Sequence, residues 1–192
     1  MAKVRLGQQK LNFPTPVVLV GAMVDGKPNF MTVAWCGMVN SEPPLVSVAV
    51  RPQRYTCRGI RENMAFSVNV PGTSLVKEAD YCGIVSGRDV NKAAACGFNV
   101  FYGNVNMAPL IEQCPVNLEC RVLHTIELES HVLFIGRVEE VHASQDCLTD
   151  GKLDFTKAQP IIYSNVVIPQ YQALGAVLGK QYTVGKELKV KV

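Results

Sequence analysis

The sequence has little of what disordered chains, membrane proteins and nucleic-acid-binding proteins need. Only 18% of its 192 residues are charged, 48% are hydrophobic and the net charge is +3, whereas disordered chains combine low hydrophobicity with high net charge. The longest apolar stretch, residues 16–24, is about half as long as a transmembrane helix, and the N-terminus lacks the apolar run of a signal peptide. The basic residues are too scattered for a nucleic-acid-binding face. We expect one cytoplasmic domain spanning residues 1–192, with no membrane and no nucleic-acid partner.

The common metal, disulfide and nucleotide motifs are also missing. The seven cysteines are odd in number, contain no Cys-x-x-Cys pair and stand mostly among apolar neighbours, which predicts reduced thiols in the core. The three histidines show no His-Glu-x-x-His spacing, so no metal site is predicted. No Gly-x-Gly-x-x-Gly turn, P-loop or Gly-x-Ser-x-Gly elbow occurs, which argues against a Rossmann enzyme, a P-loop enzyme and a serine hydrolase.

Short β-rich runs closed by turn residues recur along the chain. They predict strands at residues 16–22, 30–35, 45–50, 65–70, 116–123 and 132–141. In the fifth run Val116, Leu118, Cys120 and Val122 alternate with polar residues, which predicts one buried and one solvated face. Helical spacing predicts helices at residues 56–63, 75–82, 90–96 and 169–178. Residues 147–160 remain unassigned, with a turn at 149–152. The expected fold is mainly β, an antiparallel barrel or sandwich with few short helices.

A basic segment follows the third predicted strand and leads into a helix. It contains Arg51, Arg54 and Thr56, and a helix N-terminus adds backbone N–H groups and partial positive charge. These groups suit a phosphate. The alternative is that Thr56 only caps the helix and the arginines are solvated.

A second basic turn, Ser86-Gly-Arg-Asp-Val-Asn-Lys92, stands at another predicted helix start. Ser86 and Asp89 have capping-box spacing, so the turn is by itself an ordinary start of a helix. Both basic turns would serve one dianion if the fold brought them together.

The strand Asn29-Phe-Met-Thr-Val-Ala-Trp35 contains the only tryptophan. Asn29, Met31, Val33 and Trp35 share one face, and its amide and indole N–H both need partners. This face would suit a flat heteroaromatic ring, although Trp35 as a core residue is the alternative. His131 is either a polar residue at a strand start or a proton-transfer group in a ligand site.

In chain order, these segments resemble the flavin reductase-like family, most closely its flavoredoxin-type members. The matching motifs run through most of the chain: Phe13-Pro-Thr-Pro16, Val20-Gly21, Asn29-Phe-Met-Thr-Val-Ala-Trp35, Glu42-Pro-Pro44, Val46-Ser-Val48, Arg51, Arg54-Tyr-Thr56, Phe66-Ser-Val-Asn69, Glu78-Ala-Asp-Tyr81, Ser86-Gly-Arg-Asp-Val-Asn-Lys92, Leu118-Glu-Cys120, and His131 before Phe134-Ile-Gly136. The resemblance implies an FMN-binding split β-barrel with Greek-key antiparallel strands, which pairs as a homodimer.

The resemblance also implies roles for individual residues. Arg51, Arg54 and Thr56 would hold the FMN phosphate, and Lys92 would reach the cofactor with Ser86 and Arg88 nearby. The flavin or its ribityl chain would contact the segment comprising Asn29, Met31, Thr32, Val33, Ala34 and Trp35. His131 would be the catalytic candidate on the substrate side, where Glu129-Ser-His131 departs from the Gly-Asp-His of many family reductases.

Three functions remain open on this resemblance. In the first, FMN takes electrons from NADH or NADPH and passes them to free flavin, ferric iron or a redox protein partner. In the second, a flavoredoxin-type carrier keeps FMN tightly bound and has little NAD(P)H activity. In the third, the protein binds flavin without turnover.

Overall fold

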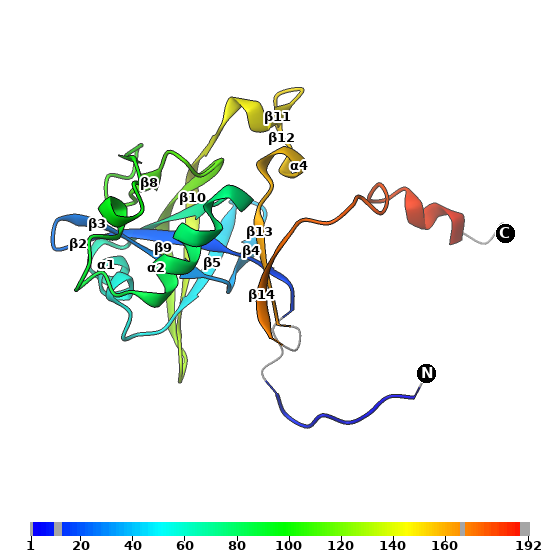
Figure 1. The fold of residues 1–192 in the computed structure, drawn as a ribbon, viewed down its shortest axis with the longest axis horizontal. Coiled ribbons are helices and arrows are strands. Elements are labelled where there is room, and N and C mark those ends of the chain that lie inside the picture. The colour runs from blue at the N-terminus through cyan, green and yellow to red at the C-terminus, as the bar shows by residue number, and fades with distance from the viewer. Residues whose placement is uncertain (1, 10–12, 166–167, 189–192) are drawn as a thin grey trace.

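The structure is a computed structural model that describes residues 2–9, 13–165 and 168–188. Seven strands form one antiparallel sheet in the order β3-β2-β6-β9-β10-β5-β4, which curls into a barrel (Figure 1). They are β2 (Val18–Val24), β3 (Lys27–Val33), β4 (Cys36–Asn40), β5 (Leu45–Val50), β6 (Ala65–Val70), β9 (Val116–Glu127) and β10 (Val132–Ala143). All six predicted strands are present, and β4 is an additional one.

The strand order is that of a Greek key. Hairpins join β2 to β3, β4 to β5 and β9 to β10, but β5 pairs with β10 and β2 pairs with β6. The β2–β3 turn places Asp25 and Gly26 at φ 49° and 73°, the left-handed pair that a tight hairpin needs. The predicted Greek-key antiparallel arrangement is confirmed.

Three small sheets complete the strand content. One consists of β1 (Thr15–Pro16), β13 (Ile161–Asn165) and β14 (Pro169–Ala173), and the others pair β7 (Val100–Phe101) with β8 (Leu110–Ile111) and β11 (Leu148–Thr149) with β12 (Lys152–Leu153). The helices are short, as expected. They are α1 (Tyr55–Asn63), α2 (Val76–Ile84), α3 (Lys92–Ala95) and α4 (Phe155–Ala158), with 3₁₀ turns η1 (Thr73–Leu75), η2 (Gln145–Cys147) and η3 (Val184–Leu188).

The strand β2 is buried on both faces and separates two apolar clusters. Val18 and Val20 point into the barrel, where they pack with Phe66 and Phe134. Leu19 faces the other way, into a cluster that contains Phe30, Ala79, Cys82 and Ile111. The helix α2 covers this second face, and the Thr32 hydroxyl donates a hydrogen bond to the Ala79 carbonyl. This contact fixes α2 against β3, the strand that lines the site described below.

The predicted solvated face of β9 is wrong at two positions. Asn117 and Glu119 are buried, because the segment containing β7 and β8 folds over this face. The Asn117 amide donates to Asn69 Oδ1 and to the Ile111 carbonyl, both at 2.8 Å. The Glu119 carboxylate accepts from Val105 N at 2.5 Å and lies 2.7 Å from His142 Nε2. Buried polar groups need such partners, and these partners come from other elements of the fold, which the local pattern of β9 does not show.

The predicted helix at residues 169–178 is also wrong. Residues 169–173 form β14, which pairs antiparallel with β13 in the register Tyr163 opposite Tyr171. The edge of β13 supplies hydrogen-bond partners, and the Tyr171 hydroxyl donates to Asp80 Oδ1 on α2 at 2.8 Å. Tertiary pairing thus outweighs the local helical spacing.

The unassigned segment at 147–160 contains a small hairpin and one helical turn. The hairpin joins β11 to β12 through Asp150 and Gly151, both at positive φ, as the predicted turn requires. The helical turn α4 begins after Asp154, whose side chain accepts from Thr156 N at 2.9 Å.

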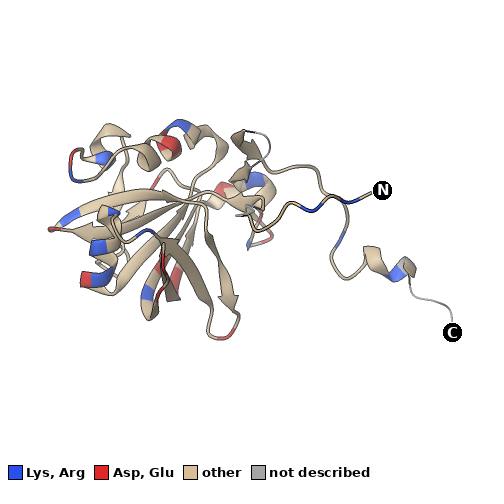
Figure 2. Ribbon diagram, turned by 90° about the horizontal axis from the view of Figure 1, so that it is seen from below, with Lys and Arg blue, Asp and Glu red and all other residues tan. Residues whose placement is uncertain are grey.

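Both ends of the described chain extend away from the barrel (Figure 1). Residues 174–188 are exposed along their described length and include Leu174, Val177, Leu178, Tyr182, Val184 and Leu188. Lysine, arginine and acidic residues are distributed over several elements of the barrel (Figure 2). No helix within residues 2–9, 13–165 and 168–188 is long and apolar enough to cross a membrane.

Candidate functional site

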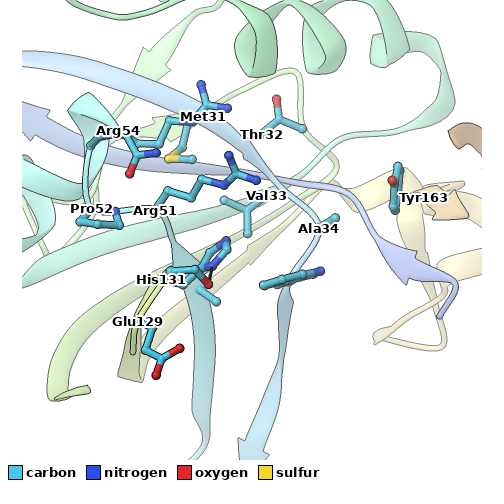
Figure 3. Close-up of a pocket in the computed structure, with 14 residues that line it drawn as sticks. Met31, Thr32, Val33, Ala34, Arg51, Pro52, Arg54, Glu129, His131 and Tyr163 are labelled. Atoms are coloured by element: carbon cyan, nitrogen blue, oxygen red, sulfur yellow. Dashed lines mark hydrogen bonds between the residues drawn. The ribbon is translucent and has the colours of Figure 1, made fainter. Parts of the chain in front are cut away.

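Two joined cavities lie where β3, the β5–α1 connection and the β9–β10 turn meet. The wide lobe has a volume of about 770 Å³ and the narrow lobe about 310 Å³. Met31, Arg51, Gln53 and Arg54 line both lobes. In Figure 3, Arg54 and Tyr163 lie at opposite ends of the wide lobe. The result is one elongated groove of a size typical of sites for small organic ligands.

Aromatic rings form one wall of the wide lobe. The rings of Trp35 and His131 lie with centroids 4.5 Å apart at an interplanar angle of 37°. Trp35 is 38% exposed, so the core interpretation of this residue is wrong. The β9–β10 turn places His131 in the groove, with Nδ1 2.8 Å from the Ser130 hydroxyl. This wall offers a flat surface against which a planar ring can pack.

Cations gather at the narrow lobe around the last turn of α2. Lys92 is 4% exposed, and its Nζ donates to the Cys82 carbonyl at 2.7 Å. Arg54 Nη1 donates to the neighbouring Gly83 carbonyl at 3.3 Å. Carbonyls at a helix C-terminus carry partial negative charge and attract cations. Each cation has further N–H donors. The α2 carbonyls therefore position both side chains and still leave donors for a ligand.

Burial lowers the pKa of Lys92. Removal of the ammonium from water disfavours its charged form, and the Arg54 charge acts in the same direction. An anion in the narrow lobe would oppose both effects.

The first turn of α1 forms the opposite side of the narrow lobe. Arg54 is the N-cap residue of α1 and makes no side-chain cap, and the buried Thr56 hydroxyl accepts a hydrogen bond from Asn29 Nδ2 at 2.7 Å. The interpretation of Thr56 as a cap is therefore wrong. Arg54, Tyr55 and Thr56 line the lobe. The start of a helix carries partial positive charge and therefore favours a negatively charged ligand there.

The second basic turn differs from the predicted capping box. Asn91 caps α3 by accepting from Ala94 N at 3.1 Å. The Ser86 hydroxyl instead accepts from Arg88 N at 3.2 Å. The helix begins later than predicted because Asn91 competes successfully for the N-cap. The turn itself lines the narrow lobe through Ser86, Gly87 and Lys92.

The structure brings together all but one of the residues predicted for the site. Those lining the groove are Asn29, Met31, Thr32, Val33, Ala34, Trp35, Arg51, Arg54, Thr56, Ser86, Lys92 and His131. Arg88 is exposed and does not line either lobe. Its guanidinium lies over the Tyr55 ring, 5.8 Å from the centroid, so it supports the wall rather than forming it.

Sequence reasoning missed several lining residues. Pro52, Gln53 and Tyr55 stand inside the first basic segment and were obtainable from it. Gly87 likewise stands inside the second basic turn, whereas Tyr163 had no signal in the sequence. A Cβ at Gly87 would collide with Asn29 and contact Tyr55, so the turn approaches β3 as closely as a glycine permits.

A family model described as "Flavin reductase like domain" matches residues 10–166. The chain belongs to the flavin reductase-like family. A relative from Archaeoglobus fulgidus is 34% identical over 142 residues, which cover 74% of this chain and 79% of the relative. The family resemblance predicted from the motifs is thereby confirmed.

Solved structures extend the match to the whole fold. Flavoredoxin from Methanosarcina acetivorans superimposes with a TM-score of 0.93 at 38% identity, covering 98% of this chain and 100% of that one. Flavoredoxin of Desulfovibrio vulgaris (Miyazaki F) gives a TM-score of 0.89 at 37% identity, with coverage of 96% and 100%. A flavin reductase with a split barrel domain from Shewanella frigidimarina also superimposes, with a TM-score of 0.78 at 19% identity and coverage of 88% and 86%, so the predicted split-barrel fold is confirmed.

Proposed function

We propose that the two-lobed groove binds FMN and that the protein transfers electrons through it. The observation that carries this proposal is the division of the groove. An aromatic-walled wide lobe suits a flat ring system, and a cation-lined narrow lobe suits the phosphate at the end of a short chain. The match to two flavoredoxins over nearly the whole chain supports the same ligand class.

The lining residues fit a phosphate ester. Arg51, Arg54 and Lys92 supply positive charge, and Thr56 supplies a hydroxyl at the start of α1. A carboxylate would repel a dianion, and the described lining of the narrow lobe contains none. Gly87 lets the second basic turn pack closely against Asn29 of β3, which holds this turn beside the narrow lobe.

A bound flavin supplies the redox chemistry, accepting hydride from a nicotinamide and giving electrons to an acceptor. The chain's own residues orient and shield it. Trp35 and His131 would form the aromatic wall against which the ring packs, and Arg51, which lines both lobes, would add positive charge that favours an anionic reduced ring. His131 would contact the substrate on the open side of the ring.

The space beside the wide lobe favours NAD(P)H as the electron donor. A third cavity of about 270 Å³ shares Thr32, Ala34 and Tyr163 with the wide lobe. A nicotinamide ring needs such room next to the flavin, because hydride transfer requires near contact. The alternative is an electron carrier with tightly bound FMN and little NAD(P)H activity, which the flavoredoxin neighbours favour.

An anaerobic visible spectrum separates these functions. The protein is reconstituted with FMN and recorded before and after addition of NADH or NADPH, and then of dithionite. Fast bleaching by a nicotinamide supports the reductase, whose acceptor is then sought among free flavin, ferric iron and redox proteins. Reduction by dithionite alone supports the carrier. A protein with no affinity for FMN would contradict both.

We further propose that the chain forms a homodimer in which the exposed segment 174–188 packs on the second copy. Its apolar side chains include Leu178 at 96% and Tyr182 at 86% exposure. The segment stands away from its own barrel (Figure 1). Apolar side chains gathered in this way are typical of an interface rather than of a solvated tail.

A further inference from the structure

Two of the seven cysteines lie in contact beside the narrow lobe. Cys82 Sγ on α2 is 4.0 Å from Cys96 Sγ at the end of α3. Both thiols are free. Formation of a disulfide requires these two sulfurs to approach to about 2 Å.

Cys82 is contacted twice by the same face of α3. Lys92 and Cys96 are four residues apart, and the Cys96 N–H donates to the Lys92 carbonyl at 3.0 Å, so their side chains project on one side of the helical turn. Lys92 Nζ binds the Cys82 carbonyl, and Cys96 Sγ meets the Cys82 thiol. A covalent bond between the two sulfurs would therefore join the same two turns that the lysine already connects.

The loop between these cysteines is part of the narrow lobe. Residues 85–91 connect α2 to α3, and Val85, Ser86 and Gly87 line the cavity. A cross-link at the two ends of this loop restricts how far it can move away from α1. Lys92 follows this loop, is buried and is bonded to the Cys82 carbonyl, so a change in the loop's freedom acts on a cation that lines the lobe.

We propose that Cys82 and Cys96 form an oxidisable thiol pair whose disulfide closes the 85–91 loop over the narrow lobe. The existence of the pair is independent of the proposed function, whereas the effect on FMN exchange rests on it. The prediction that all seven cysteines are reduced thiols would then hold at these two positions only in the absence of an oxidant.

Hydrogen peroxide is a suitable oxidant. Cys96 is partly exposed and Cys82 is buried, so the Cys96 thiolate attacks the peroxide O–O bond, giving a sulfenic acid and hydroxide. The Cys82 sulfur then attacks the Cys96 sulfur, and the S–O bond breaks with release of water. In total, two thiols and one peroxide give one disulfide and two waters, with the sulfurs oxidised and the peroxide reduced.

The surroundings of the pair make its oxidation depend on pH. Burial raises the pKa of Cys82 to about 12 and also raises that of Cys96; the Glu78 charge acts in the same direction and Lys92 opposes it. Thiolate is therefore scarce at neutral pH, and oxidation should accelerate as the pH rises. The reduced pair is expected to persist without peroxide.

The test uses the full chain, reduced and then treated with peroxide. Remaining thiols are alkylated, and non-reduced peptides are sequenced by mass spectrometry to distinguish Cys96 from the nearby Cys114. Cleavage after the exposed Arg88 by trypsin reports loop movement without any ligand. The release rate of FMN is measured in parallel. Cys96→Ser removes the pair, and Cys36→Ser removes another partly buried thiol as a control.

We expect a Cys82–Cys96 cross-link that a dithiol reverses, with trypsin cleavage and FMN release each slowed about fivefold. Cys36→Ser should behave like the parent, and Cys96→Ser should show neither effect. A folded protein that forms no cross-link, or one between other cysteines, would overturn the thiol pair. A cross-link that leaves cleavage after Arg88 unchanged would overturn the loop closure. A protein that forms the cross-link and slows cleavage but never binds FMN would support the pair and contradict only the proposed function.

Discussion

The amide of Asn29 donates a hydrogen bond to the Thr56 hydroxyl across 2.7 Å and joins β3 to the first turn of α1. Both residues are nearly fully buried, at 5% and 1% exposure. The bond orients the Thr56 hydroxyl, which lines the narrow lobe, and the side-chain oxygen Oδ1 of Asn29 lies against Gly87 of the second basic turn. One asparagine thus positions the two basic turns relative to each other.

Gly87→Ala should weaken FMN binding about tenfold, because the added Cβ collides with Asn29 and pushes the turn away from β3. Flavin fluorescence quenching measures the affinity. Gly37→Ala is the matched control, since nothing lies within 4 Å of a Cβ at that position. If Gly87→Ala and Gly37→Ala bound FMN equally well, the close packing of the turn on β3 would not contribute to FMN binding.

Lys92→Met should weaken FMN binding by about ten- to a hundredfold, the cost of one charge-assisted hydrogen bond to a phosphate. Methionine retains most of the buried volume, so the free energy of unfolding should change little. The control is Lys77→Met, which removes an exposed lysine of α2. The measurement is titration with FMN and with riboflavin, which lacks the phosphate. If Lys92→Met affected both ligands equally, the lysine would not be a phosphate ligand.

FMN affinity should fall at alkaline pH, beginning below the ordinary lysine range. Burial lowers the pKa of Lys92 in the free protein, and a bound phosphate dianion raises it again. Between these two pKa values binding takes up a proton, so the dissociation constant rises by about tenfold per pH unit. Titrations from pH 7 upwards measure this slope. In Lys92→Met, only the titration of the ligand itself should still change the affinity with pH. Identical pH curves for the parent and the variant would contradict the assignment of the pH dependence to Lys92.

Much of the groove was predictable because its residues lie in contiguous segments. The segment from Asn29 to Trp35 has the pattern of a strand, which the structure continues only to Val33, and Arg51 to Thr56 leads from a strand into a helix, so local pattern reveals both. Their convergence is a property of the sheet order, which no local pattern contains. Tyr163 and the binding of Lys92 by the Cys82 carbonyl depend on that order and had no signal in the sequence.

The failures have the same physical cause. Asn117 and Glu119 alternate with apolar residues as a solvated strand face would, yet the segment before β9 folds back over them, and Asn69 and His142 supply further partners. Residues 169–173 have helical spacing, yet they form a strand that pairs with the edge of β13. In each case a tertiary partner outweighs the local preference.

His142→Ala should lower the free energy of unfolding by about 3 kcal/mol, because it leaves the fully buried Glu119 carboxylate without one of its partners. Val105 N would remain as its hydrogen-bond donor. Urea denaturation measures the change. His124→Ala removes an exposed histidine from β9 and serves as the control. A loss in His142→Ala no larger than in His124→Ala would mean that the Glu119 contact contributes little.

The double variant Val177→Glu and Leu178→Glu should convert the proposed dimer to a monomer. Both side chains are exposed in the single chain, at 77% and 96%, so the fold of the monomer has no reason to change. Charges buried at an apolar interface are costly and would oppose association. Sedimentation velocity measures the mass in solution. Lys180→Glu adds negative charge to the same segment without removing an apolar side chain, and should remain dimeric. A parent protein that sediments as a monomer, or a double variant that remains dimeric, would contradict the proposed role of the segment.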